Sequence, residues 1–324
     1  AQHAQFGGVV PELAARAHLE AIDLVIGKAL QTAGFALSDI DAFAATAGPG
    51  LIGGVAVGTV TAKAIAAARQ RPYFAINHLE GHALSARLAD SVEFPYLLLL
   101  VSGGHTQLLA VAGPGQYHRY GTTMDDAAGE AFDKCAKIMG LGYPGGPAIE
   151  AAAQQGDATA IALPRPLKGA DHCHFSFSGL KTALANKFKQ LGGAEKAPVN
   201  DLAASLQAAI ADCLADRSHH AMAQFHRDYV QASTSAPPVL VIAGGAAANK
   251  YIFAQLADTA SKNGFRLSVP PAALWTDNAA MIAWAALERH QQNAGDSDGF
   301  DFAPRPRWPL DAHASPPPGR GVRA

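Results

Sequence analysis

The chain has 324 residues, of which 49% are hydrophobic and 16% are charged. This composition excludes disordered, collagen-like and coiled-coil proteins, and it suffices for one large domain or two coupled lobes. No apolar run reaches the roughly 18 residues that a membrane span needs, and no secretory signal is evident, so we expect a cytoplasmic protein without membrane contact. The net charge of −2 gives no bulk attraction for nucleic acid, so a polyanion must be bound by a local patch or by other subunits.

The first part of the chain is expected to alternate helices and strands, which predicts α/β architecture. A proline suits the first turn of the first helix, and a glycine follows its end. In chain order the expected elements are a helix over 11–33, a strand over 42–47, a helix to about residue 69, a strand over 73–77 and a helix from about residue 78.

The second part begins with the apolar run YLLLLV, typical of a fully buried strand, and a Ser-Gly-Gly-His turn leads from it into another strand. A hairpin in an α/β protein indicates a mixed sheet. The expected elements are strands over 96–101 and 106–112, helices over much of 126–229, a strand over 239–243, a helix from about residue 249, a helix over 277–291 and a disordered tail from about residue 315.

Two histidines four residues apart, His78 and His82, are the clearest local signal. On a helix of about 100° per residue they lie within about 40° of one face, so both imidazoles can reach one metal ion. Glu80 lies about 200° from His78, on the opposite side, whereas the metalloprotease pattern HExxH has its glutamate directly after the first histidine. Surface or helix-capping histidines would explain the same spacing, and a third ligand is needed to decide.

Asp277 is a candidate third ligand, because it opens the last expected helix in the string WTDN. A carboxylate at a helix start is also an ordinary capping residue, and capping alone would explain it. Two histidines and one carboxylate that leave open positions suit Fe(II) or Zn(II) ions that also bind a substrate.

Two glycine-rich turns form a second candidate site, one at 102–105 between two strands and one at 244–245 between a strand and a helix. Backbone amides at such turns can approach a phosphate or a sugar closely, although a plain hairpin or helix entry also needs glycine. The sequence has neither a GxxxxGK[ST] loop nor a convincing GxGxxG pattern, which excludes P-loop and Rossmann-type sites.

A polar cluster lies within an otherwise apolar segment. Helical periodicity places Asp126, Glu130, Asp133 and Lys134 near one another on one side of a helix, and a solvated helix face is the simpler interpretation of them. The string DHCH at 171–174 is interpreted as a loop, because adjacent loop residues rarely converge on one ion.

Taken together, these strings resemble the bacterial TsaD family, whose relatives include the catalytic subunit of the archaeal and eukaryotic KEOPS complex. The resemblance extends over residues 5–310. Its motifs are GGVVPE (7–12), TAGPGL (46–51), HLEGH (78–82), VSGGHT (101–106), DDAAGEAFDK (125–134), YPGGP (143–147), FSFSGLKT (175–182), Gly244-Gly245 with Asn249, and TDNAA (276–280).

The resemblance implies the two-lobed fold of actin, sugar kinases and heat-shock ATPases, the ASKHA fold, with ligand held between the lobes. The family normally begins further upstream, so we expect the first lobe to lack its N-terminal strands and doubt that this chain is active by itself. The expected divisions are a first lobe over 1–94, a nucleotide-binding second lobe over 95–276, a C-terminal helix and return segment over 277–310 and a disordered tail over 311–324.

The resemblance also implies a site and a reaction. One divalent metal, Fe(II) or Zn(II), is expected on His78, His82 and Asp277, where it would orient and polarise the carbamoyl group; no other catalytic residue is assigned. The reaction is transfer of the threonylcarbamoyl group from threonylcarbamoyl-AMP to the exocyclic amine of the adenosine next to the anticodon, in tRNAs reading codons that begin with A. The residues expected to bind the adenylate are Val101, Ser102, Gly103, Gly104, His105, Asp133, Gly146 and Asn249.

The partners implied are tRNA, the paralogue TsaB on the first lobe, the ATPase TsaE and a TsaC-type enzyme that supplies the adenylate. Asp133 is expected to contact ribose or to take part in proton movement. Two other functions are weighed: a metal-dependent glycoprotease, against which the direction of Glu80 argues, and a non-catalytic nucleotide-binding scaffold. Trp275, where the family usually has a smaller residue such as cysteine, is expected to affect local packing.

Overall fold

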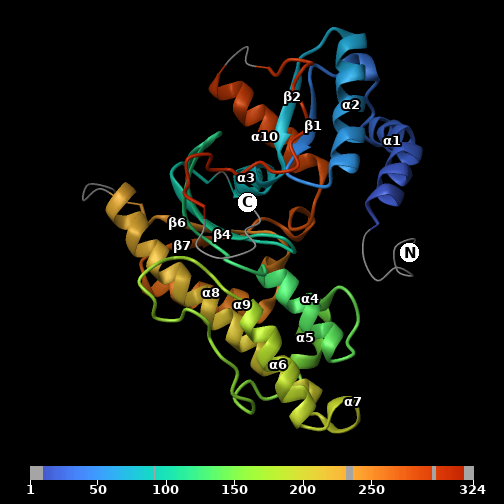
Figure 1. The fold of residues 1–324 in the computed structure, drawn as a ribbon. Coiled ribbons are helices and arrows are strands. Elements are labelled where there is room, and N and C mark those ends of the chain that lie inside the picture. The colour runs from blue at the N-terminus through green and yellow to red at the C-terminus, as the bar shows by residue number, and fades with distance from the viewer. Residues whose placement is uncertain (1–9, 91, 231–235, 294–296, 317–324) are drawn as a thin grey trace. The chain divides into compact units, whose positions relative to one another are not determined.

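The computed structural model describes residues 10–90, 92–230, 236–293 and 297–316, and it shows mixed α/β structure (Figure 1). The chain divides into two compact units, one of Ala1–Leu84 with Asn278–Ala312 and the other of Ser85–Asp277 with His313–Arg323. Within the described ranges, no helix combines the length and the apolar character needed to cross a bilayer. Of the tail expected to be disordered, residues 317–324 lie outside the described residues.

Two parallel strands form the centre of the first unit. β1 (Phe43–Gly48) pairs with β2 (Tyr73–Asn77), and the crossover helix α2 (Ile52–Arg69) connects them, as a parallel pair requires. Asp298 bridges to β2, and the amide of Arg305 donates a hydrogen bond to β1. The return segment therefore satisfies backbone groups that a two-stranded sheet alone would leave unpaired.

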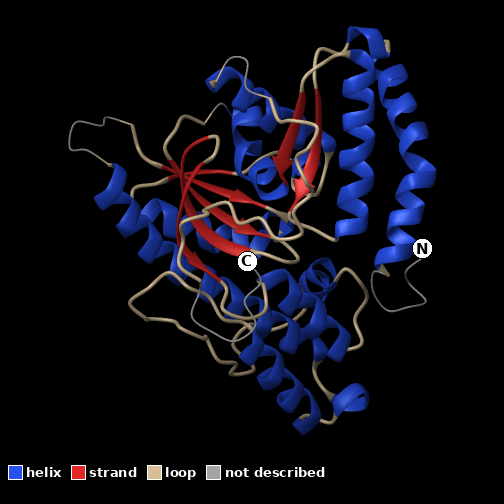
Figure 2. Cartoon of the chain, turned by 45° about the horizontal axis from the view of Figure 1, so that its top comes forward, coloured by secondary structure: helices blue, strands red, loops and turns tan. Residues whose placement is uncertain are grey.

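α1 (Pro11–Ala33) has the predicted bounds, because Pro11 fits a first turn and Gly34 ends the helix in the left-handed region at φ +72°. It lies beside α2 in both views (Figures 1 and 2). No residue of α1 is buried, and the side chains of Leu19 and Leu24 are 65% and 71% exposed.

The second unit contains a five-stranded mixed sheet with the strand order β5-β4-β3-β6-β7. The predicted hairpin is confirmed as the antiparallel pair β3 and β4, and β6 joins β3 in parallel. β5 and β7 were not predicted from the sequence. The bounds are β3 (Tyr96–Val101), β4 (Thr106–Gly113), β5 (Gln116–Thr122), β6 (Val239–Ala243) and β7 (Arg266–Ser268).

Helices cover this sheet, and their inward faces share one core with the apolar side chains of β3. The helix predicted from Asp126 begins two residues later, because Asp126 belongs to the segment that precedes it. The bounds are α4 (Ala128–Ile138), α5 (Gly145–Ala153), α6 (Ser178–Gln190), α7 (Gly193–Lys196), α8 (Val199–Tyr229) and α9 (Lys250–Lys262).

Asp125 fixes the start of α6. Its carboxylate accepts hydrogen bonds from the hydroxyls of Ser176 and Ser178, at 2.6 and 2.8 Å, and from the amides of Phe177 and Ser178, at 2.8 and 3.2 Å. Burial raises the pKa of Asp125, but these four bonds outweigh burial and hold the pKa below its usual value.

Stability should therefore depend on the charge of Asp125. Because its pKa is lower in the folded protein, the contribution is complete above the unfolded-state pKa of about 3.9 and is lost as pH falls through the folded value. We expect Asp125→Asn to lose about 2 kcal/mol of unfolding free energy at pH 7, the scale of a hydrogen bond to a charged group. In urea titrations from pH 7 to pH 3, stability should decline less in this variant than in wild type; equal slopes would contradict the assignment.

Candidate metal centre and nucleotide-binding turns

The junction of β2 and α3 (His78–Asp90) sets the direction of the two histidines. β2 continues into α3 without a loop, and α3 begins at His78 as predicted. The buried side chain of Asn77 accepts a hydrogen bond from the amide of Leu79 at 2.9 Å and donates one to the carbonyl of Trp308 at 2.9 Å. Asn77 therefore caps the first turn of α3 and connects it to the return segment.

α3 approaches α10 (Ala279–Gln292) closely at Gly81. A Cβ atom on Gly81 would lie 2.9 Å from Cδ1 of Ile282 and 3.0 Å from Cγ of Met281. Glycine thus allows the first turn of α10 to lie against the histidine-bearing turn, a role that local sequence patterns do not reveal.

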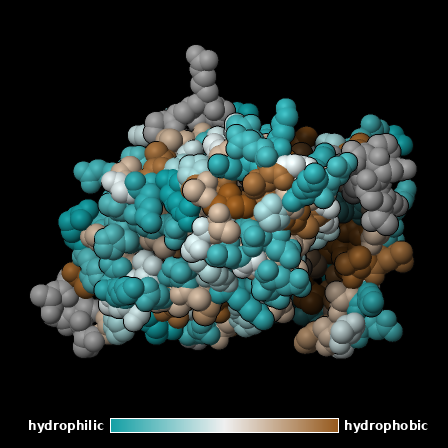
Figure 3. All heavy atoms as spheres, turned by 90° about the horizontal axis from the view of Figure 1, so that it is seen from below, coloured by the Kyte–Doolittle hydropathy of each residue, from teal (hydrophilic) through white to brown (hydrophobic). Residues whose placement is uncertain are grey.

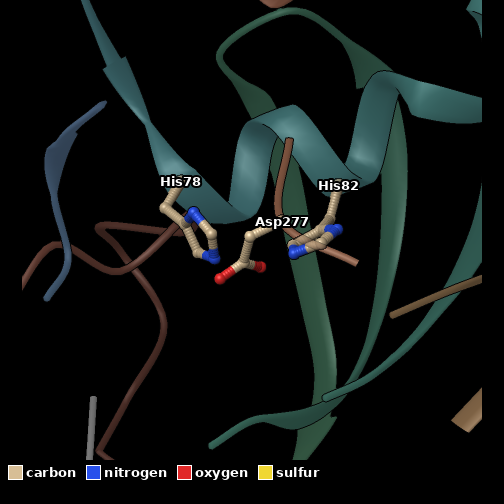
Figure 4. A group of neighbouring side chains, drawn as sticks. All are labelled: His78, His82 and Asp277. Carbon is tan, nitrogen blue, oxygen red and sulfur yellow. The ribbon is translucent and has the colours of Figure 1, made fainter. Parts of the chain in front are cut away.

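His78, His82 and Asp277 come together around the start of these two helices (Figure 4). Each offers one ligand atom, and these atoms lie within 4.8 Å of one another. The imidazole centroids are 4.9 Å apart, and the side chain of His82 is almost fully buried. Two imidazole nitrogens and a carboxylate oxygen at this spacing are a donor set that fits a transition metal such as zinc or iron.

Helix capping does not account for Asp277. The last helix begins at Ala279, two residues later than predicted, and its cap is Asn278, whose Oδ1 accepts a hydrogen bond from the amide of Met281 at 2.9 Å. The capping interpretation is therefore wrong, and the ligand interpretation of Asp277 gains support.

Glu80 is 5% exposed and is not part of the three-residue group. This agrees with its predicted position on the other side of the helix from the histidines. The arrangement found among the described residues thus lacks the neighbouring glutamate of a HExxH protease.

The proposed role of Asp277 as a metal ligand and the role of Asn278 as a helix cap can be separated by experiment. We expect Asp277→Asn to lower the metal content of the purified protein while changing the free energy of unfolding little in the presence of chelator. Asn278→Ala should cost about 1 kcal/mol, the usual effect of removing a helix cap. Metal analysis and urea unfolding with EDTA check both, and equal metal loss in both variants would contradict the division of roles.

The two glycine turns follow neighbouring parallel strands, because Leu100 of β3 lies opposite Ala243 of β6. Ligands of open α/β sheets bind at the carboxyl ends of such strands. Gly244 has φ +93°, and a Cβ atom there would lie 2.4 Å from the carbonyl oxygen of Val101. The two turns are thus in direct contact.

The turn at 102–105 is closed by its own hydrogen bonds. The amide of Ser102 donates to the carbonyl of His105 at 2.8 Å, and the amide of His105 donates to Oγ of Ser102 at 3.1 Å. A Cβ atom on Gly129 of α4 would lie 2.6 Å from the carbonyl oxygen of Ser102. The first turn of α4 therefore packs directly against this turn, while Gly103 and Gly104 are exposed.

The remaining adenylate candidates lie on helices that adjoin these turns. Oδ1 of Asp133 accepts a hydrogen bond from the amide of Gly145 at 2.7 Å, directly before Gly146. Asn249 is buried: its Oδ1 caps α9 at the amide of Ile252, and its Nδ2 donates to Gln207 at 2.8 Å. The structure thus uses the side chain of Asn249 to hold the entry of α9.

The four residues of the predicted polar cluster form two separate sets of contacts. Nζ of Lys134 contacts carboxylate oxygens of Asp126 and Glu130 at 2.7 and 3.0 Å. Asp133 instead binds the start of α5. The prediction of a solvated helix face is therefore not confirmed, because Asp126 precedes α4 and the side chains of Asp126 and Glu130 are only 18% and 19% exposed. Asp133 connects two helices beside the glycine turns.

Comparison with known proteins shows the family of this chain. Residues 1–284 match the family model described as TsaD: tRNA N6-adenosine threonylcarbamoyltransferase. Proteins named tRNA N6-adenosine threonylcarbamoyltransferase from Brucella suis and Brucella melitensis are 56% identical over 323 residues, covering 100% of this chain and 89% of theirs. The crystal structure of T. kodakarensis HypF, 15% identical, covers 79% of this chain and 42% of its own with a TM-score of 0.56, a likeness of fold alone. The chain belongs to the TsaD family.

Proposed function

We propose that this chain transfers the threonylcarbamoyl group of threonylcarbamoyl-AMP to N6 of the adenosine next to the anticodon, in tRNAs that read codons beginning with A. The observation that carries the proposal is the group of two imidazoles and one carboxylate, in a chain 56% identical to named tRNA N6-adenosine threonylcarbamoyltransferases. The chain is accordingly a tRNA-modifying transferase.

The reaction needs no covalent intermediate on the protein. The N6 amine forms a bond to the carbamoyl carbon, the bond from that carbon to the phosphate oxygen breaks, AMP leaves and the amine releases one proton. His78, His82 and Asp277 would hold one divalent ion, Fe(II) or Zn(II). When bound, that ion supplies Lewis-acid polarisation of an acyl oxygen.

The glycine turns would hold the AMP part. Exposed backbone at Gly103 and Gly104, beside the first turn of α4, presents peptide amides of the kind that bind phosphate. Asp133 and Gly146 would contact the nucleoside from the start of α5. Val101, Ser102, His105 and Asn249 would shape these turns, as their hydrogen bonds and packing indicate.

We further assign the chain to the ASKHA fold, which the mixed sheet and the fold likeness to HypF support. The expected lobes over 1–94 and 95–276 correspond only roughly to the two compact units, which divide after Leu84 and include Asn278–Ala312 in the first. TsaB, TsaE and a TsaC-type enzyme are proposed as partners. The alternative of a glycoprotease is disfavoured by the position of Glu80 outside the metal group.

The proposal is tested by incubating the full chain, with its proposed partners, with threonylcarbamoyl-AMP and unmodified tRNA. We expect AMP release that depends on tRNA and equals the modified adenosine measured by nucleoside mass spectrometry. AMP release without modified adenosine would contradict the transfer, and cleavage of a glycoprotein substrate would favour the protease alternative.

A further inference from the structure

One helix of the second unit, α6, carries exposed lysines and no acidic residues. Between Asp171 and Glu195 the sequence contains three lysines and no aspartate or glutamate. The three, Lys181, Lys187 and Lys189, are exposed on α6. Leu180 and Leu184 of the same helix are buried in the core and hold it in place. The segment therefore presents positive charge to solvent from a fixed position.

These lysines differ from two other lysines on helices of the second unit, Lys134 and Lys262. Lys134 pairs with Glu130 and Lys262 with Asp258, each four residues apart. In contrast, no ion pair joins the α6 lysines to any described residue. A chain of net charge −2 thus concentrates unneutralised positive charge on one helix, the electrostatic pattern of a nucleic-acid contact.

An exposed aromatic side chain follows α4, a helix that packs against α6. Tyr143, in the connection between α4 and α5, is 86% exposed, more than any other large hydrophobic residue described. It lies two residues before Gly145, whose amide binds Asp133. Lys137, also exposed, lies on the last turn of α4. An aromatic ring gains little from exposure to water, and aromatic rings that face solvent are the usual stacking platforms for unpaired RNA bases.

α4 and α6 are neighbours, so Lys137 and the α6 lysines lie on adjoining helices, and Tyr143 lies in the connection that leaves α4 (Figure 1). Lys181 is close enough to α4 to act on the buried thiol of Cys135. Burial raises the pKa of this thiol, and the positive charge of Lys181 lowers it. Figure 3 views the chain from the side on which Figure 1 places α6 and α7, and hydrophilic side chains predominate there.

We propose that Tyr143, Lys137 and the three lysines of α6 form a contact surface for the anticodon arm of the tRNA substrate. The lysines would bind phosphates, and the ring of Tyr143 would stack on a base of the loop, beside the turn that leads to Gly145. This inference rests on the proposed function, because it names the part of the second unit that binds the same tRNA.

The charge is tested with the triple variant Lys181→Gln, Lys187→Gln, Lys189→Gln. Its matched control, Lys28→Gln, Arg69→Gln, Arg266→Gln, removes the same charge from exposed positions elsewhere. We expect the α6 variant to raise KM for tRNA by about 10-fold or more, with kcat at saturating tRNA preserved. The slope of log K for tRNA binding against log[salt] should fall in magnitude by about two to three. The control variant should change neither KM for tRNA nor this slope appreciably.

The aromatic contribution is tested with Tyr143→Ala and Tyr143→Phe. We expect the alanine variant to weaken tRNA binding about 10-fold and the phenylalanine variant to restore it, because stacking needs the ring and not the hydroxyl. Equal effects of the two triple variants, or weakened binding of a protein partner with unchanged tRNA binding, would overturn the inference. Wild-type protein that transfers no threonylcarbamoyl group would instead refute the proposed function, so the two failures are distinct.

Discussion

His82→Ala is expected to reduce bound metal to background and to lower kcat/KM for tRNA modification by more than about 100-fold. Changing an outer-shell partner of a metal ligand already costs 10- to 100-fold, so removal of a ligand itself should cost more. The imidazole is almost fully buried within a group whose three ligand atoms lie within 4.8 Å. His78→Ala should behave similarly, because the two histidines offer equivalent donors from successive turns.

Metal content by plasma mass spectrometry and turnover with saturating adenylate check this prediction. His219→Ala is the control, since His219 is an exposed histidine that contacts Asn263 in the second unit. EDTA should lower the melting temperature of wild type and leave that of His82→Ala unchanged, because a metal that binds the folded state stabilises it. Full metal content and activity in both ligand variants would favour ordinary surface histidines and the scaffold function.

The sequence predicts best those elements whose ends carry strong local signals. Pro11 and Gly34 bound α1, and the glycine-rich turn after Val101 defines the β3-β4 hairpin. β5 escapes prediction because its first half, Gln116 to Arg119, is polar and partly exposed. β7 has three residues and is paired with the sheet at β6, a contact that no local pattern encodes.

The same distinction applies to the candidate site. The spacing of His78 and His82 is local and gives their shared face directly. Asp277 is distant in sequence, and only the resemblance to TsaD proteins singled it out over a helix cap. The close approach at Gly81 brings α10 to α3, and it depends on tertiary packing that periodicity cannot show.

Arg217 is a further residue whose role the sequence does not show, because it lies within a long helix where an arginine is ordinarily solvated. In the structure it is 1% exposed on α8. Its guanidinium donates hydrogen bonds to the carbonyls of Ala170, at 2.7 Å, and His172, and its Nε lies 2.9 Å from Oδ2 of Asp216. Asp216 in turn accepts a hydrogen bond from the amide of Gly169. One buried cation thus holds the loop before α6 against α8.

Arg217→Ala is therefore expected to lower the free energy of unfolding by about 3–5 kcal/mol, because removing one partner of a buried pair leaves the other charge uncompensated. Burial by itself raises the pKa of Asp216, while Arg217 and the Gly169 amide lower it below its usual value. In the variant this pKa should rise. The stability deficit should therefore shrink as pH falls, first as Asp216 becomes neutral in the variant and further as it becomes neutral in the wild type at its lower folded pKa.

Urea unfolding at pH 7 and pH 3.5 measures both effects, with the exposed Arg266→Ala as the control, which should change stability by less than about 0.5 kcal/mol. Arg217→Lys separates the effect of charge from that of shape. A lysine restores the positive charge, but its ammonium group cannot donate hydrogen bonds to the carboxylate and both carbonyls in the planar arrangement of a guanidinium. We expect it to recover part of the loss. Full recovery by lysine would show that charge alone holds the loop, and a loss below about 1 kcal/mol in Arg217→Ala, the net value of a single ordinary hydrogen bond, would contradict the anchoring role.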